Sequence, residues 1–277
     1  MNFRLRQSYS LFMRLLLLGA VFVSVQPTYA ASQSQQNVST SSLKLRSQAE
    51  QGDAVAQYNL AQSYLRLDPA NEDYQSAVKW LRSSAAQGNA DAEFLLGYLY
   101  EHGQGVPRDY TRAAEYYRAA ALQAHTTAEN NLASLYQHGL GVPKNMSKAV
   151  EWYLTSAQHG NPVGQCNLAT LYYLGSGTPR DYKEAARWFR AAADSGSAEA
   201  QNSLAIFYYK GLGVSLDYTE AARWLQLAVQ CCIDLGDSLL GRLGQPEPPR
   251  SCHLLGAGRA DLSDMARERW PRDPCGP

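Results

Sequence analysis

The sequence predicts an all-α fold, an α/α solenoid (superhelix) of five 36-residue helical-hairpin repeats plus a degenerate capping helix. Three kinds of residue recur at this spacing, as in chains built from repeated structural units that stack on their neighbours. The tyrosine column is Tyr64, Tyr100, Tyr136, Tyr172 and Tyr208. The leucine column is Leu60, Leu96, Leu132, Leu168 and Leu204. The alanine column is Ala77, Ala113, Ala149, Ala185 and Ala221.

Each repeat is predicted to hold two helices, and the first carries a small residue, a leucine and a tyrosine. At Ala56, Leu60 and Tyr64 these residues lie at i, i+4 and i+8, on one stripe of a helix. The helix is then expected to end at a glycine pair such as Gly103 and Gly105, because glycine adopts the left-handed conformation without steric cost. The buried face and the end of the first helix are therefore both predicted.

The second helix is expected to begin at a short polar residue that accepts hydrogen bonds from exposed backbone amides. These capping residues are Asp73, Asp109, Asn145, Asp181 and Asp217. Glu184 and Glu220 follow two of the caps by three residues, which favours a capping box. A large aromatic residue seven positions after each cap is predicted to lie in the core. These residues are Trp80, Tyr116, Trp152, Trp188 and Trp224.

The periodic region is bounded on both sides by segments of different composition. Residues 1–30 are predicted to be a signal peptide, and the Ser- and Gln-rich residues 31–48 a flexible leader. The solenoid is expected over 49–243, where Ile233 to Leu243 forms the degenerate sixth first helix that caps the stack. Three prolines then end the periodicity, so 244–277 is predicted to be a loose C-terminal tail.

The N-terminus predicts export. Arginines precede an apolar run from Leu15 to Val25, and Thr28 and Ala30 supply the small residues read by an export peptidase. The apolar run is too short to cross about 30 Å of hydrocarbon as a helix. We therefore expect cleavage after Ala30, no stable membrane insertion afterwards, and a periplasmic or secreted protein.

Charge and cysteine content exclude several classes of function. Lys plus Arg and Asp plus Glu both number 25, so no net field attracts nucleic acid. The five cysteines have no paired C-x-x-C spacing, which argues against a zinc site. In an oxidising compartment Cys252 could pair with Cys275, Cys231 or Cys232, and the spacing leaves this connectivity open.

The repeat unit resembles the Sel1-like repeat, a relative of the tetratricopeptide repeat. Ala92, Gly97 and Tyr100, followed by the run from Gly103 to Tyr110, match that pattern, and the resemblance covers residues 49–232. It implies an α/α superhelix whose first helices line a concave surface. It also implies a role in assembling protein complexes, often at the bacterial envelope or against host proteins.

The resemblance places candidate partner-binding residues on the first helices. Tetratricopeptide-like proteins carry asparagine at an equivalent concave position, where its amide can bind a peptide backbone. The candidate residues are Asn59, Asn131, Asn167, Tyr98, His102, His138 and Lys210. The histidines and Lys210 could instead be solvated helix-end residues, and Tyr98 could be a packing residue. The expected partner is a protein or a peptide, and we predict no cofactor, metal or catalytic residue.

An enzyme is the alternative from another class of function. Ser76 and Lys79 fit the S-x-x-K spacing of serine acylating enzymes, which makes a β-lactamase-like or cell-wall-acting exported enzyme the alternative. No S-D-N or K-T-G segment accompanies them. We therefore predict that the protein is not an enzyme. A secreted virulence factor that acts on host proteins is a further alternative.

Overall fold

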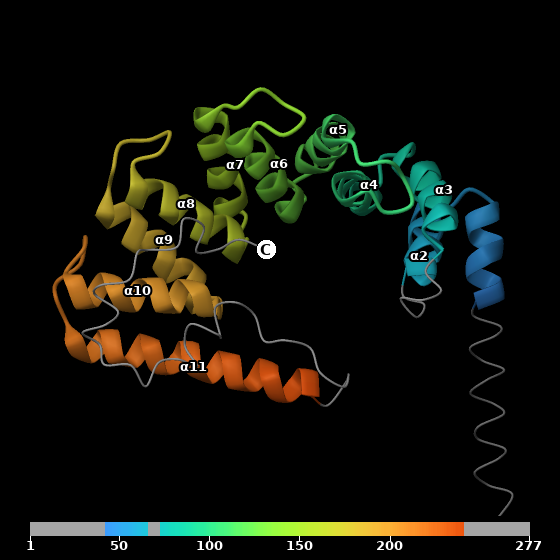
Figure 1. The fold of residues 1–277 in the computed structure, drawn as a ribbon. Helices are drawn as coiled ribbons and strands as arrows, with labels where there is room; N and C mark the ends of the chain where they lie inside the picture. Colours follow the sequence, from blue (N-terminus) through green and yellow to red (C-terminus); the bar gives the residue numbers. More distant parts are fainter. Residues whose placement is uncertain (1–41, 66–72, 241–277) are drawn as a thin grey trace, which may run out of the picture. The chain divides into compact units, whose positions relative to one another are not determined.

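A computed structural model describes residues 42–65 and 73–240, with side chains to residue 230. Every regular element in these residues is a helix, and the helices pair as predicted (Figure 1). The pairs are α2 (Ala54–Leu65) with α3 (Tyr74–Ala85), α4 (Ala90–His102) with α5 (Tyr110–Ala121), α6 (Thr126–His138) with α7 (Met146–Gln158), α8 (Pro162–Leu174) with α9 (Tyr182–Asp194), and α10 (Ala198–Lys210) with α11 (Tyr218–Leu240). The all-α repeat prediction is confirmed. None of the described helices is both long and apolar enough to span a membrane.

The fold divides into two compact units at Ser84 and Ala85. The first unit contains an additional helix over residues 42–50, before α2. Leu45 and Ala49 of this helix pack with Ala56 of α2, and Gln57 Nε2 donates to the Ala49 carbonyl at 3.0 Å. The helix therefore stands where the second helix of a preceding repeat would stand.

This helix differs from the expected flexible leader over 31–48. Its apolar residues Leu45 and Ala49 are four apart, so they lie on one helix face that α2 buries. Ala49 also lies 36 residues before Ala85 and so belongs to a repeat column. Residues 31–41 and the predicted signal peptide lie outside the described residues.

The predicted caps of the second helices are confirmed, but the capping box is not. Asp181 Oδ1 accepts from the backbone amides of Lys183 and Glu184 at 2.9 and 3.0 Å. A capping box would require Glu184 to accept from the Asp181 amide, which instead donates to the Tyr172 carbonyl at 3.0 Å. Glu184 pairs with Arg187 at 2.9 Å, and Glu220 likewise faces an arginine three residues on. The two glutamates therefore form ion pairs on the helix surface and do not accept a hydrogen bond from the amide of the cap residue.

The two glycines of each pair have different structural roles. The first, such as Gly139 with φ of 73°, ends the first helix in the left-handed conformation. The second contacts the preceding repeat. A Cβ atom on Gly177 would lie 2.8 Å from the Met146 carbonyl oxygen, and one on Gly141 would overlap the Tyr110 backbone. The second glycine thus permits direct backbone contact between neighbouring repeats.

The predicted capping helix over Ile233 to Leu243 does not form a separate element. Residues 233–240 continue α11, which runs without a break from Tyr218 to Leu240. In the earlier repeats a residue with positive φ and a helix cap separate the two helices, as at Gly196 and Ser197. Cys232 and Ile233 occupy these positions here, and neither favours a left-handed turn or an N-cap. The predicted tail beyond residue 243 lies outside the described residues.

Replacing Ala124 by glycine is expected to stabilise the protein by about 1 kcal/mol, because a left-handed backbone strains a residue with a Cβ atom. Ala124 has φ of 61°, whereas the equivalent Gly88, Gly160 and Gly196 have φ between 80° and 88°. Urea denaturation of wild type and Ala124→Gly measures the difference. An equal or lower free energy of unfolding in the variant would refute the strain at this position.

Candidate partner-binding surface

One pair of neighbouring first helices, α6 and α8, is in direct contact. No comparable contact joins neighbouring second helices among the described elements. The solvent-facing side chains of the first helices α4, α6, α8 and α10 form what we call the first-helix face. Its main members are Tyr98, His102, Asn131, His138, Val163, Asn167, Leu174 and Lys210.

A chain of side-chain hydrogen bonds links four helices beneath this face. Tyr117 of α5 is 0% exposed, and its hydroxyl donates to Glu101 Oε2 at 2.5 Å. Burial, with the nearby Glu101 carboxylate, raises the pKa of Tyr117, while a hydrogen bond from the Asn131 side chain opposes that shift. Asn130 Nδ2 donates to Asn131 Oδ1 at 3.2 Å, and Asn167 Nδ2 donates to Asn130 Oδ1 at 2.9 Å.

This network changes the expectation for the asparagine column. Asn131 Oδ1 accepts from Asn130 Nδ2, and the Asn131 side chain lies close enough to the Tyr117 hydroxyl of α5 to lower its pKa, so this residue contributes to the packing of α5 on α6. Asn167 uses its amide nitrogen in the same network, and its Oδ1 has no described partner. Asn59 lies exposed on α2 of the first unit. Peptide binding through Asn59, Asn131 and Asn167 stays a prediction. Asn131 also takes part in the hydrogen bonds beneath the face.

His102 and His138 adopt the same arrangement in successive repeats. Each is exposed, and each Nδ1 lies 2.9 Å from the backbone carbonyl four residues earlier, that of Tyr98 or Ser134. Because a carbonyl can only accept, Nδ1 must carry the proton, which leaves Nε2 as an acceptor in the neutral ring. The His102 ring also stacks on Tyr98, with 4.0 Å between centroids. The Tyr98 side chain is 37% exposed and held in place by this stack.

Two apolar side chains on α8 were not among the predicted site residues. Val163 and Leu174 are both exposed, although each is large and hydrophobic. They lie eleven residues apart on one stripe of the helix, three turns from end to end. Lys210 occupies the position of Leu174 in the next repeat and is also exposed. The first-helix face therefore combines apolar, aromatic and imidazole groups.

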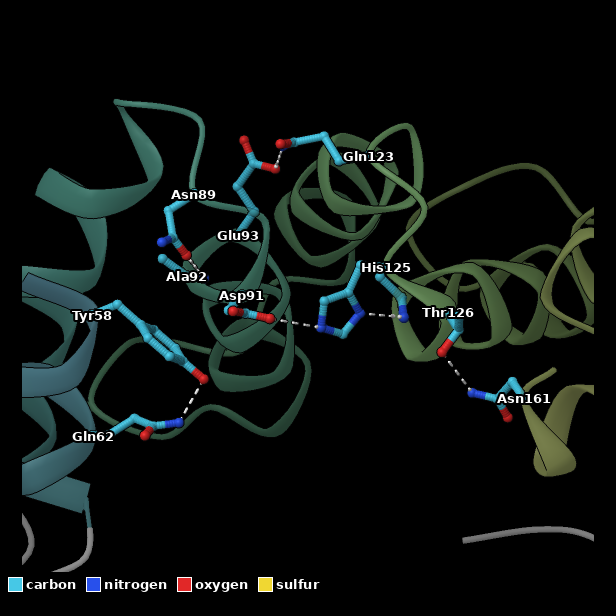
Figure 2. Close-up of polar contacts among 11 residues, drawn as sticks. Tyr58, Gln62, Asn89, Asp91, Ala92, Glu93, Gln123, His125, Thr126 and Asn161 are labelled. Carbon is cyan, nitrogen blue, oxygen red and sulfur yellow. Dashed lines mark hydrogen bonds and ion pairs between the residues drawn. The ribbon is translucent and has the colours of Figure 1, made fainter. Parts of the chain in front are cut away.

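A buried column on the first helices carries glutamine in three repeats and glutamate in two. Gln57, Gln165 and Gln201 each donate from Nε2 to an alanine carbonyl eight residues earlier. Glu93 instead accepts from Gln123 Nε2 at 2.8 Å (Figure 2). Glu129 is 0% exposed, lies 2.8 Å from His159 Nδ1, and leaves Oε2 without a partner in the described structure. The two glutamates therefore accept a hydrogen bond at the positions where the three glutamines donate one.

A second polar cluster joins the N-termini of successive first helices (Figure 2). His125 Nδ1 caps α6 by accepting from the Ala128 amide at 3.2 Å. Its Nε2 lies 3.5 Å from Asp91 Oδ1, and its ring stacks on Phe94. Sequence reasoning missed this residue, although it occupies the cap column of Asn89, Asn161 and Ser197. The cluster stabilises the junction between the repeats that contain α4 and α6.

Replacing Glu93 by glutamine is expected to raise the melting temperature by about 2–4 °C at pH 7 and to have little effect at pH 4. Burial raises the pKa of Glu93 above its ordinary 4.5 despite the Gln123 hydrogen bond. The folded state then holds the proton more tightly than the unfolded chain does, so stability falls as the pH rises above 4.5. Glutamine removes this cost. Thermal melts at both pH values test it, and equal shifts would contradict it.

Ser76 and Lys79, the S-x-x-K pair in the first unit, make local contacts at and within α3. The Ser76 amide donates to Asp73 Oδ1 at 2.9 Å, and the Ser76 side chain hydrogen-bonds the same carboxylate and lowers the Asp73 pKa. Lys79 Nζ lies over the Trp80 ring, 5.8 Å from its centroid. No three His, Cys, Asp or Glu side chains gather as a metal site within the described residues.

Comparison with known proteins agrees with this geometry. The Sel1 repeat family matches residues 54–89, 90–125, 126–161, 162–197 and 198–231. A Sel1 repeat protein from Oxalobacter formigenes is 29% identical, with a TM-score of 0.61 over 80% of this chain and 88% of that one. The protective antigen c5321 of uropathogenic Escherichia coli, which has the same fold, is 29% identical, with a TM-score of 0.51 over 76% of this chain.

The present chain spans about half of the c5321 structure, 54% of its length. No curated protein sequence matches significantly. Sel1 repeat proteins act as scaffolds for protein–protein interaction. Five consecutive matches cover most of the described helices, and the four repeats from residue 90 onward each carry the glycine pair that ends the first helix. The chain belongs to the Sel1 repeat family.

Proposed function

We propose that the protein is an exported scaffold that binds an extended segment of a partner protein on the first-helix face. The exposed Tyr98 ring, stacked on His102, is the observation that carries this proposal. A rigid aromatic side chain loses little conformational entropy when a ligand covers it, so such residues often anchor interfaces. The ordering of Tyr98 by its neighbour reduces that loss further.

The chemistry of the first-helix face favours a particular kind of segment. Tyr98, Val163 and Leu174 offer apolar contact, while the row at the helix C-termini carries His102, His138 and Lys210. The Lys210 cation there is also favoured by the dipole of its helix. A segment with apolar side chains and a carboxylate along one edge would satisfy both features. Screening by salt should weaken only the second contribution.

Export is supported by two independent features. The first 30 residues have the layout of a cleavable signal peptide. Cys166 is disulfide-bonded, and disulfides persist in oxidising compartments such as the periplasm or the cell exterior. The related c5321 protein is a protective antigen, which agrees with a location accessible to the host. Intact mass of the protein purified from its native envelope tests export, and a chain that still begins at Met1 would contradict cleavage.

Partner binding is tested by cross-linking and affinity capture from the envelope fraction. Tyr98→Ala combined with His138→Ala removes exposed groups without disturbing the buried network, so the variant should fold normally. We expect it to lose a partner that wild type captures. Leu122→Ala is the matched control, because Leu122 is exposed at the end of a second helix. Equal capture by the double variant and wild type would exclude these residues from the site.

A further inference from the structure

The last second helix, α11, exposes a face that earlier second helices bury. On α5 and α9 this face consists of three residues that are each at most 4% exposed: Ala114, Tyr117 and Ala121 on α5, and Ala186, Phe189 and Ala193 on α9. Phe189 contacts Phe207 of the following first helix, α10, with 5.2 Å between the ring centroids. A second helix therefore uses this face to pack on the next repeat.

On α11 no described helix covers this face. The equivalent residues, 36 positions after those of α9, are Ala222, Leu225 and Val229. Ala222 is exposed, Leu225 is partly buried and Val229 is 40% exposed. Helix α11 packs on α10, and none of the described helices follows it (Figure 1). The described repeat array thus ends in an apolar face that is shaped to pack on a further helix.

The same face continues along α11 as a coiled-coil pattern. Helix α11 has 23 residues whereas α10 has 13, and it extends past the end of α10 (Figure 1). Six apolar positions on α11 alternate at spacings of three and four residues, the spacing of the contact seam between two coiled helices. These positions, which we call the α11 seam, are Ala222, Leu225, Val229, Cys232, Gly236 and Leu239. None of them carries a charge.

The order of residues along the α11 seam is complementary to itself. If two copies of α11 run antiparallel and cross between positions 230 and 231, the opposed positions are Ala222 with Leu239, Leu225 with Gly236, and Val229 with Cys232. Each pair joins a larger residue with a smaller one, which fills the space between the helices evenly. A parallel pair would instead place Gly236 opposite Gly236 and Leu239 opposite Leu239, so a gap would adjoin a crowded layer.

We propose that the protein forms a two-fold homodimer in which the α11 seams of two copies pack antiparallel. Two-fold symmetry needs a self-complementary surface, because residue i of one copy contacts residue j of the other and j contacts i. The α11 seam meets this requirement, and antiparallel helix dipoles attract each other. The seam shares no residue with the first-helix face. A dimer therefore carries two such faces, and a partner with two copies of the bound segment would gain avidity.

Sedimentation equilibrium of the full-length protein at micromolar concentrations tests the dimer. We expect wild type to sediment as a dimer, and Val229→Glu to raise the dissociation constant about 100-fold, because it buries an unpaired charge in the seam. Leu227→Glu is the matched control, since Leu227 is also 40% exposed but lies on the opposite side of α11. A monomeric wild type, or a Leu227→Glu variant that dissociates at least as readily as Val229→Glu, would overturn the proposal.

An exchange of residue sizes tests the antiparallel register by the same measurement. Ala222→Leu places a leucine opposite position 239 of the second copy and should weaken the dimer about 10-fold through overpacking. Adding Leu239→Ala to the same chain restores one large and one small residue in that layer, so the double variant should dimerise as wild type does. In a parallel dimer these two positions do not meet. An unimpaired Ala222→Leu variant, or a double variant no stronger than the single one, would overturn the register.

Discussion

Gly141→Ala is expected to lower the free energy of unfolding by about 2–5 kcal/mol, the largest effect of any single change considered. Two penalties add. The residue has φ of 67°, which strains any side chain with a Cβ atom. The new methyl group would also overlap the backbone of Tyr110 at the start of α5 in the preceding repeat. Urea denaturation followed by circular dichroism measures the loss.

Gly160→Ala is the matched control for this change. Gly160 also has positive φ, 83°, but no atom lies within 4 Å of the Cβ position. Its substitution should cost about 1 kcal/mol, from backbone strain alone. Similar losses in the two variants would show that the backbone contact between repeats at Gly141 contributes nothing.

His159→Ala is expected to cost about 3 kcal/mol, because it leaves a buried carboxylate without its partner. Glu129 is 0% exposed, and the His159 ring nitrogen at 2.8 Å is its one described side-chain partner. The His159 side chain is itself 43% exposed, so water that enters in its place moderates the loss. Denaturation at pH 7 measures the effect. His138→Ala, which removes an exposed histidine, should change stability by less than about 0.5 kcal/mol.

The double variant separates charge from packing at this site. Glu129→Gln gives α6 the residue that α8 and α10 carry, whose amide can donate to the alanine carbonyl eight residues earlier. With glutamine there, His159→Ala no longer strands a buried charge, and most of the loss should disappear. If the double variant is as unstable as His159→Ala, the cost comes from lost packing of the imidazole.

Much of the repeat fold can be predicted from the 36-residue period. The helix starts follow from the cap column, and the helix ends follow from the first glycine of each pair. The same columns also held two features that sequence reasoning missed. Ala49 continues a column into the helix over 42–50, and Cys232 with Ile233 breaks the turn signal within α11. Both differences arise where a terminal repeat departs from the pattern.

The binding surface is less predictable, because spacing along the chain does not show which polar groups already have partners. Asn131 falls in the same sequence column as Asn59 and Asn167, yet its amide oxygen accepts from Asn130 and its side chain lies near the buried Tyr117 hydroxyl. That contact depends on a tyrosine of another helix. Glu129 was missed for a different reason, since a fully buried carboxylate is rare and needs a partner such as His159.

Site-specific photo-cross-linking in cells tests most directly whether the first-helix face binds a protein partner. A photoreactive phenylalanine analogue is placed at Tyr98 or His138, and at Glu115 on the surface of the second helix α5 as the control. The account predicts the same cross-linked partner from positions 98 and 138 and none from position 115. A partner captured from position 115 but not from the other two would contradict it and would place binding on the second helices.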